Sequence, residues 1–163
     1  MSKFMKAALA SSALVAFAIS ATAARADTAT ADARANILAQ VSVDSDGSNL
    51  DFGTIVTGTD ASTIAVNAAG SATCGTGLVC SGTTTAAGFD VSGTTGETVD
   101  VSVDSSVTLT GPNGTMTAAL SASDETIVLD GSDAFSVGGV LSVGANQADG
   151  AYVGSFNVAV VYQ

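Results

Sequence analysis

The sequence lacks histidine and tryptophan, and it contains one proline, two cysteines and four basic residues among 163. Without histidine, no catalytic triad with an imidazole base can form, and a zinc site would need carboxylates to complete it, which is rare. The sequence also has no G-x-S-x-G elbow, Walker loop or dinucleotide fingerprint. These absences predict a protein that is not an enzyme and has no catalytic residues, no cofactor and no metal.

Residues 1–26 have the anatomy of a secretory signal peptide. Lys3 and Lys6 precede an apolar run, and small residues follow it up to Ala24-Arg25-Ala26. A transmembrane helix is the alternative, but the run is shorter than the roughly 20 apolar residues that a span requires. We therefore expect cleavage after Ala26, no integral membrane segment in the mature chain, and a secreted protein that passes through the periplasm to the cell surface.

The expected mature chain is strongly acidic. Removal of 26 of the 163 residues would leave 137, the size of one ordinary domain. Arg34 would then be the one positive side chain against fifteen negative ones, which gives a formal net charge of −14. Such a chain repels phosphate backbones and anionic headgroups, so we expect no nucleic-acid partner and no peripheral binding to membranes.

Short alternating segments predict an all-β fold. Apolar residues recur at every second position, and turn signals such as Asp46-Gly47, Gly111-Pro112-Asn113-Gly114 and Gly138-Gly139 separate the segments. Seven or more strands without helices predict an immunoglobulin-like antiparallel β-sandwich, with a jelly roll or small barrel as the alternative. The segments are Leu50–Phe52, Thr63–Asn67, Phe89–Val91, Val99–Val103, Val107–Leu109, Met116–Leu120, Phe135–Val137 and Leu141–Val143.

The last fourteen residues, from Gly150 to Gln163, predict a long terminal strand. From Tyr152 onward the even positions carry the aromatic residues and two valines, which is a period of two. Such a strand must lie inside a sheet or against a partner molecule. The residues expected on the partner-facing side are Gly150, Tyr152, Gly154, Phe156, Val158, Val160 and Tyr162.

A second alternating run, of about fifteen residues, starts at Ala29 and is much longer than the usual five or six. We expect residues 27–36 to be an N-terminal extension that can lie along a neighbouring molecule, with a reach of about 33 Å. Ile37–Val43 would be the first strand of a sandwich domain at residues 37–163. The candidate donor residues are Ala29, Ala31, Ala33, Ala35 and Ile37.

Alanine makes this extension a weak donor strand. Each alanine buries about one methyl group, near 0.8 kcal/mol, against roughly 1.5–3 kcal/mol for valine or isoleucine. The main-chain ladder would have to supply most of the binding. The alternative is an extension that folds back as an edge strand of its own domain.

Cys74 and Cys80 are expected to form an intramolecular disulfide, because they are the only cysteines of a chain with an export signal. Their spacing does not match a C-x-x-C redox pair, so the bridge is predicted to be structural.

Three further patterns have simple interpretations. They are Asp124-Glu125 as a solvated loop rather than a glycosidase pair, Asp44–Asn49 as a turn rather than a calcium loop, and Asn113-Gly114-Thr115 as an exposed turn that fits the N-glycosylation acceptor pattern.

Two stretches of the sequence resemble a known family. Leu50-Asp51-Phe52-Gly53-Thr54-Ile55 and the segment from Leu141 to Val160 resemble the bacterial domain-of-unknown-function family numbered 4402, over essentially the whole mature chain. That family has no assigned enzymatic activity. More distantly, the sequence resembles the spore-coat-U-like pilins of the archaic chaperone–usher pathway, which share an early L-x-F-G turn, a small disulfide loop and a C-terminal strand ending in an aromatic residue.

The pilin resemblance implies a fibre subunit. Such pilins generally carry a penultimate tyrosine and a glycine fourteenth from the C-terminus, which correspond to Tyr162 and Gly150. It also implies a sandwich that lacks one strand, whose groove is filled by a periplasmic chaperone and later by the extension of the next subunit. The expected partners are therefore a homo-polymer, a periplasmic chaperone and an outer-membrane usher. The alternative is a self-complete periplasmic or surface sandwich that binds a carbohydrate or a protein.

Overall fold

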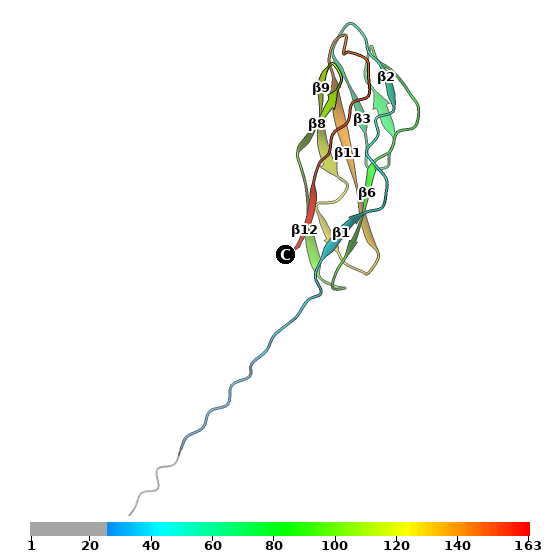
Figure 1. The fold of residues 1–163 in the computed structure, drawn as a ribbon. Helices are drawn as coiled ribbons and strands as arrows, with labels where there is room; N and C mark the ends of the chain where they lie inside the picture. Colours follow the sequence, from blue (N-terminus) through cyan, green and yellow to red (C-terminus); the bar gives the residue numbers. More distant parts are fainter. Residues whose placement is uncertain (1–25) are drawn as a thin grey trace, which may run out of the picture. The chain divides into compact units, whose positions relative to one another are not determined.

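The computed structural model describes residues 26–163 and shows an all-β domain of antiparallel strands (Figure 1), which confirms the predicted sandwich class. Within the described part of the chain, no helix is long and apolar enough to cross a membrane. The predicted signal peptide lies outside the described residues except for Ala26. The strands are β1 (Ser42–Ser45), β2 (Thr54–Val56), β3 (Ser62–Val66), β4 (Ala72–Cys74), β5 (Val79–Ser81), β6 (Ala87–Ser92), β7 (Thr98–Val103), β8 (Ser106–Gly111), β9 (Gly114–Ala122), β10 (Thr126–Val128), β11 (Asp133–Val143) and β12 (Val158–Tyr162).

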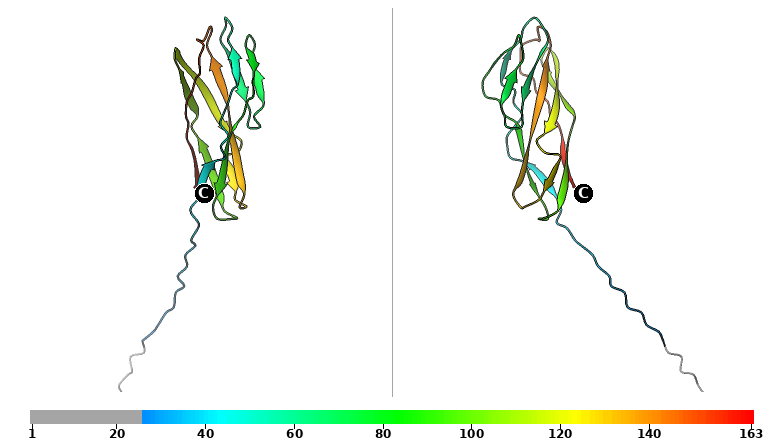
Figure 2. Two further views of the ribbon diagram at one scale, coloured as in Figure 1. Left: turned by 45° about the vertical axis from the view of Figure 1, so that its right-hand side comes forward. Right: turned by 180° about the vertical axis from the view of Figure 1, so that it is seen from behind.

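A seven-stranded sheet forms one layer of the sandwich, with β11 at its centre. On one side, the first half of β11 pairs with β6 and its second half pairs with β3, while β9 pairs along the other side. The outer strands are β1 beside β6, β4 beside β3, and β8 beside β9. Two further views show that β11 runs most of the length of the sandwich (Figure 2), so it connects both of its ends.

Two smaller sheets form the second layer. The sheet β10-β7-β12 packs over β6 and the first half of β11, and the pair β2-β5 packs over β3 and the second half of β11. We call these two regions the β12 end and the β2 end. β7 is followed after two residues by β8, which belongs to the large sheet, so this part of the chain passes from one layer to the other.

The hydrophobic core follows this division into two clusters. At the β12 end it includes Val99 and Val137, which are fully buried, and Phe135, whose ring stacks on Phe89 at 5.2 Å between centroids. At the β2 end it is built around Ile64, Val143 and similar side chains. Leu50, Leu120 and Phe156 contact both clusters, so the core is continuous.

The predicted turn at Gly138-Gly139 is wrong, because both glycines lie buried inside β11. A Cβ atom at Gly138 would lie 2.5 Å from the carbonyl oxygen of Val66, and one at Gly139 would lie 2.9 Å from that of Ala119. Glycine is required here by the close approach of neighbouring strands rather than by a change of chain direction. The two segments predicted on either side are one strand.

The predicted first strand also differs from the structure. β1 spans Ser42–Ser45, and residues 26–41 form no strand. The alternating pattern before β1 consists mostly of alanine, which offers little apolar surface, and a strand without a pairing partner is not stable in water. Leu50–Phe52, likewise expected as a strand, contributes only one isolated bridge between Asp51 and Thr85.

Candidate partner-binding groove

The C-terminal segment keeps the predicted alternation over its whole length. Val153, Ser155 and the later odd-numbered residues are exposed, so the even side of the segment faces the core. The prediction of one continuous strand from Tyr152 is wrong, because only Val158–Tyr162 form β12. The side chains on the inner side are Tyr152, Phe156, Val158, Val160 and Tyr162.

A change of register explains why the strand is shorter than predicted. Val153 forms an isolated bridge with Thr110, whereas Val158 pairs with Val103. Between these two pairs the C-terminal segment advances by five residues and the partner segment by seven, so the register shifts by two residues. Gly154 lies in this transition, where a Cβ atom would overlap the carbonyl oxygen of Thr108. The C-terminal segment thus follows β8 and β7 without a complete ladder between them.

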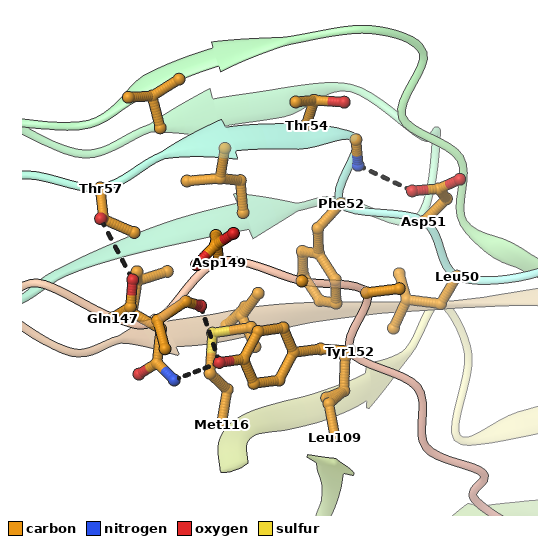
Figure 3. A pocket seen from close by; sticks show the side chains of 18 residues that line it. Leu50, Asp51, Phe52, Thr54, Thr57, Leu109, Met116, Gln147, Asp149 and Tyr152 are labelled. Carbon is orange, nitrogen blue, oxygen red and sulfur yellow. Dashed lines mark hydrogen bonds between the residues drawn. The ribbon is translucent and has the colours of Figure 1, made fainter. Parts of the chain in front are cut away.

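A groove with a volume of about 730 Å³ lies between two segments at the β2 end (Figure 3). One wall is Leu50–Thr57, which contains β2, and the other is Gln147–Tyr152. The floor is apolar and comes from β8, β9 and β11 of the large sheet. Its side chains are Leu109, Met116, Leu141 and Val143.

Tyr152 holds the second wall in place. Its hydroxyl donates to the carbonyl oxygen of Ala148 at 2.8 Å and accepts from Nε2 of Gln147 at 2.8 Å, as Figure 3 shows. The ring lies against Gly111, where a Cβ atom would come within 2.7 Å of it. Gly150 has a φ of +138° and lies close to Pro112, so the hairpin between β8 and β9 supports this wall.

Hydrogen bonds join the two sides of the groove beyond β2. The hydroxyl of Thr57 donates to the carbonyl of Gln147 at 3.4 Å, and the amide of Asn146 donates to the carbonyl of Gly58 at 2.9 Å. Apart from this side-chain bond of Thr57, the walls Leu50–Thr57 and Gln147–Tyr152 are not connected by any hydrogen bond between their main chains in the described structure. The walls are therefore closed at one end and open to solvent along their length.

Tyr162 makes the corresponding connection at the β12 end. Its hydroxyl donates to the carbonyl of Ala39 at 2.8 Å and accepts from the amide of Thr94 at 2.7 Å. β1 and β12 approach each other here, with Cα atoms within 8 Å, but no ladder joins them among the described strands. Both strands therefore border the second layer without pairing with each other.

β12 has one unpaired main-chain edge. The carbonyl of Asn157 accepts from the amide of Asp104, and the amide of Gln163 donates to the carbonyl of Thr98. The odd-numbered residues of the C-terminal segment therefore form the main-chain hydrogen bonds to β7. In an antiparallel ladder the alternate residues then direct their N–H and C=O groups away from that partner. Such an edge can accept an additional strand. The outward groups belong to Val158, Val160 and Tyr162, and these have no backbone partner in the described part of the chain.

The rim of the groove is acidic. Asp51 and Asp149 are exposed on opposite walls, and Oδ1 of Asp51 accepts from the amide of Gly53 at 2.7 Å. Neither carboxylate contacts a cation, since the one salt bridge among residues 26–163 joins Arg34 to Asp32 at 3.3 Å. In the same residues no three His, Cys, Asp or Glu side chains are placed to hold a metal ion.

The predicted disulfide between Cys74 and Cys80 is confirmed, with 6.0 Å between the Cα atoms. Cys74 ends β4 of the large sheet and Cys80 lies in β5 of the two-stranded sheet, so the bridge links the two layers at the β2 end. This link could not be predicted from the sequence, because the sheet that each cysteine joins depends on distant pairing partners. The bridge therefore does more than close its own short loop.

The remaining predicted sites lie apart from the groove. Asp124-Glu125 is exposed in the connection before β10, and the predicted turn at Asp44–Asn49 begins within β1 and contains Gly47 at a φ of +95°. Asn113 is exposed in the hairpin between β8 and β9. The candidate donor residues belong to no strand and are exposed, Ile37 by 89%. They are Ala29, Ala31, Ala33, Ala35 and Ile37.

Residues 41–162 match the family described as domain of unknown function DUF4402. The chain belongs to this family. The DUF4402 region contains all twelve strands and both walls of the groove, whereas residues 27–36 lie outside it. No curated protein and no solved structure matched the chain.

Proposed function

We propose that this protein is a non-enzymatic, secreted structural subunit that polymerises at the cell surface by donor-strand exchange. Residues 27–36 of one copy would lie in the groove of the next copy and extend toward the free edge of β12. The observation that carries the proposal is an open apolar groove at the β2 end together with an unpaired strand edge at the β12 end, both bordered by the C-terminal segment. Strand addition of this kind combines main-chain hydrogen bonds with side-chain contacts in pockets.

The dimensions of the two parts are compatible with this assembly. The wall Leu50–Thr57 has eight residues, which corresponds to about 26 Å of extended chain at roughly 3.3 Å per residue. The extension of ten residues reaches about 33 Å by the same measure, so it can cover the whole wall. The extension belongs to no strand in the described structure and is available for pairing.

The alanines of the extension offer little apolar surface to the groove. Each added main-chain hydrogen bond contributes roughly 0.5–1.5 kcal/mol, so several of them offset the small apolar area of alanine. This accounts for a donor strand that binds mainly through its backbone.

The same features explain why partners would be needed before assembly. A subunit with an open apolar groove and a free β12 edge is prone to incorrect association, since exposed edges are templates for other strands. A periplasmic chaperone that covers this edge, and an outer-membrane usher that exchanges it for the next extension, would prevent this. We propose both as partners, together with other copies of the chain.

The proposal is tested by replacing residues 27–36 with a Gly/Ser segment of equal length. The variant keeps the signal region and the sandwich, so it should be exported and folded, but it should form no polymer. Size-exclusion chromatography and electron microscopy of the secreted material measure this, and the wild-type chain serves as the reference. Polymer formation at an unchanged rate would refute the proposal.

A self-complete surface sandwich that binds a carbohydrate or a protein is the second candidate function. It is favoured by the hydrogen bonds that already join the two sides at both ends of the second layer, through Thr57 with Gln147 and through Tyr162 with Ala39. This candidate predicts that purified protein unfolds and refolds reversibly as a monomer without any chaperone. Analytical ultracentrifugation combined with thermal unfolding distinguishes the two candidates.

A further inference from the structure

We propose that the groove recognises the chain segment before β1 of a second copy through two of its residues. Ile37 would occupy the apolar floor of the groove, and Arg34 would meet the carboxylates of Asp51 and Asp149 at its rim. This inference rests on the proposed strand exchange and adds to it the residues that set the register of the incoming strand.

Ile37 is the exposed large apolar side chain of this segment, whereas Leu38 and Val41 are partly buried. Ile37 is 89% exposed in its own domain, and between residues 26 and 36 the apolar side chains are all alanine. Burial of isoleucine is worth roughly 1.5–3 kcal/mol, against about 0.8 kcal/mol for one methyl group. The groove, at about 730 Å³ and with Leu109 and Met116 in its floor, has room for a branched side chain.

The alternation of the segment places Arg34 at the rim when Ile37 faces the floor. Side chains of opposite parity in an extended strand point to opposite faces, so residue 34 points toward solvent if residue 37 points inward. The two residues would be about 10 Å apart along the strand. Asp51 and Asp149 are exposed residues of the two walls, and Figure 3 labels both side chains.

Arg34 gives a second copy of this chain a local charge that complements the acidic rim of the groove. Arg34 is the only basic residue among residues 26–163, which otherwise contain fifteen acidic ones, so two copies repel each other overall. Its present partner is Asp32, and both side chains of that pair are at least 85% exposed. An exposed pair is worth little, so Arg34 can exchange it for a carboxylate of the rim, where a guanidinium can form two parallel hydrogen bonds.

The position of Ile37 also limits the distance between neighbouring subunits. Ala39 is held to its own domain by Tyr162 and by Oγ1 of Thr94, which accepts from the Ala39 amide at 2.7 Å. Ile37 therefore lies only about 7 Å of extended chain away from this anchor. If it enters the groove of the next copy, the two domains are in contact, and the polymer is a continuous fibre rather than a string of separated beads.

The first test replaces Ile37 in the full chain. Ile37→Asn should slow polymerisation at least about tenfold, which corresponds to roughly 1.4 kcal/mol, while Ile37→Val should stay within about threefold of wild type. Val79→Asn is the matched control, because Val79 is 64% exposed and does not line the groove. Since Ile37 is exposed, thermal unfolding of the monomer should be unchanged and confirms that each variant folds.

The second test is a charge exchange. Arg34→Glu should slow polymerisation about tenfold at low salt, and Asp149→Arg in the same chain should restore most of the rate. Asp124→Arg, an exposed position away from the groove, adds the same charge and should restore much less. Equal rescue by both substitutions would mean that only net charge matters and would overturn the assignment of Arg34 to the rim.

A direct probe of occupancy comes from Met116, the one methionine among residues 26–163. Methyl-labelled mature protein should show one methionine resonance, which shifts on polymer formation in wild type and keeps its monomer position in soluble Ile37→Asn.

The outcomes separate the register from strand exchange itself. If the Gly/Ser replacement of residues 27–36 abolishes the polymer but Ile37→Asn and Arg34→Glu assemble normally, the register is wrong and strand exchange stands. If that substitution has no effect on assembly, strand exchange and this inference both fail.

Discussion

The two ends of the sandwich differ in how the second layer is completed. At the β12 end, three hydrogen-bonded strands cover the large sheet, and core residues such as Val99 and Val137 are fully buried. At the β2 end, the cover is a two-stranded sheet and a C-terminal segment with one isolated bridge, and an open groove lies between them. The same large sheet supports both ends, so the difference arises from the second layer alone.

This contrast separates a closed region from an open one within one domain. A continuous ladder covers the core at the β12 end, but each of the two core clusters contains eight buried residues, so apolar burial contributes to the free energy of unfolding at both ends. The β2 end leaves part of its apolar floor available, and it relies on the disulfide and on hydrogen bonds such as that of Thr57 with Gln147. Local stability should therefore be lower at the β2 end, as is common for binding regions.

The largest difference is expected between Phe135→Ala and Met116→Ala. Phe135 is 3% exposed and stacked on Phe89, so its truncation should lower the free energy of unfolding by about 3–5 kcal/mol. Met116 is half-buried beside open space, so its truncation leaves no closed cavity and should cost about 1 kcal/mol. Urea unfolding of both variants measures the difference. Equal losses would show that the two ends are packed to the same degree.

The second prediction concerns the covalent link between the layers. Replacement of Cys74 and Cys80 by serine should lower the free energy of unfolding by about 2 kcal/mol, the amount expected for a short closed loop. Hydrogen exchange should increase in β4, β5 and β2 and stay unchanged in β7 and β12. A uniform increase across the domain would contradict the independence of the two ends.

The side-chain faces could be predicted from sequence, whereas several pairings could not. Alternation is a local property, so the inward side of the segment around Phe156 and Val160 and the pairing of the two cysteines were accessible. Whether a segment finds a partner depends on residues far away in the chain. Gly138 was therefore misinterpreted as a turn, since the neighbouring backbone at Val66 that requires a glycine is not visible in the sequence.

The groove could not be predicted for the same reason. Its walls are about ninety residues apart, as the hydrogen bond between Thr57 and Gln147 shows. Phe52 was predicted only as part of a short strand with an L-x-F-G turn, and Tyr152 was predicted as a partner-facing residue of the terminal strand. The alanine run from Ala29 to Ala35 was predicted as strand-like because it alternates, but alternation without large apolar residues or a partner does not produce a strand in the isolated chain.

The third prediction tests the transition between the two ends. In Gly154→Ala, the new methyl group would overlap the carbonyl of Thr108, so the segment should shift away from β8 at a cost of about 1–3 kcal/mol. Amide exchange should increase at Val153 and Thr110, whose bridge has hydrogen bonds of 2.8 and 3.1 Å. Ser155→Ala, at the exposed neighbour, is the control and should have almost no effect. Unchanged exchange at Val153 would contradict the required close approach.

The smallest effects are expected from the two tyrosines that join segments distant from each other. Tyr162→Phe removes one hydroxyl that bonds to both Ala39 and Thr94, and it should cost about 1–2 kcal/mol because the Thr94 amide loses its acceptor. Tyr152→Phe removes the bonds to Gln147 and Ala148 beside the open groove, where water can replace them, and should cost about 0.5–1 kcal/mol.

Hydrogen exchange separates these two effects by location. Tyr162→Phe should free the carbonyl of Ala39 and leave this residue held only by the bond from its amide to Thr94, so exchange of that amide should increase. The weaker anchor would weaken the close contact between subunits that Ile37 provides. Tyr152→Phe should leave Ala39 protected and should change exchange only in the wall Gln147–Tyr152 and the hairpin that supports it. If Tyr152→Phe released Ala39 as well, the groove and the anchor of the N-terminal segment would be coupled, and the two ends would form one cooperative unit.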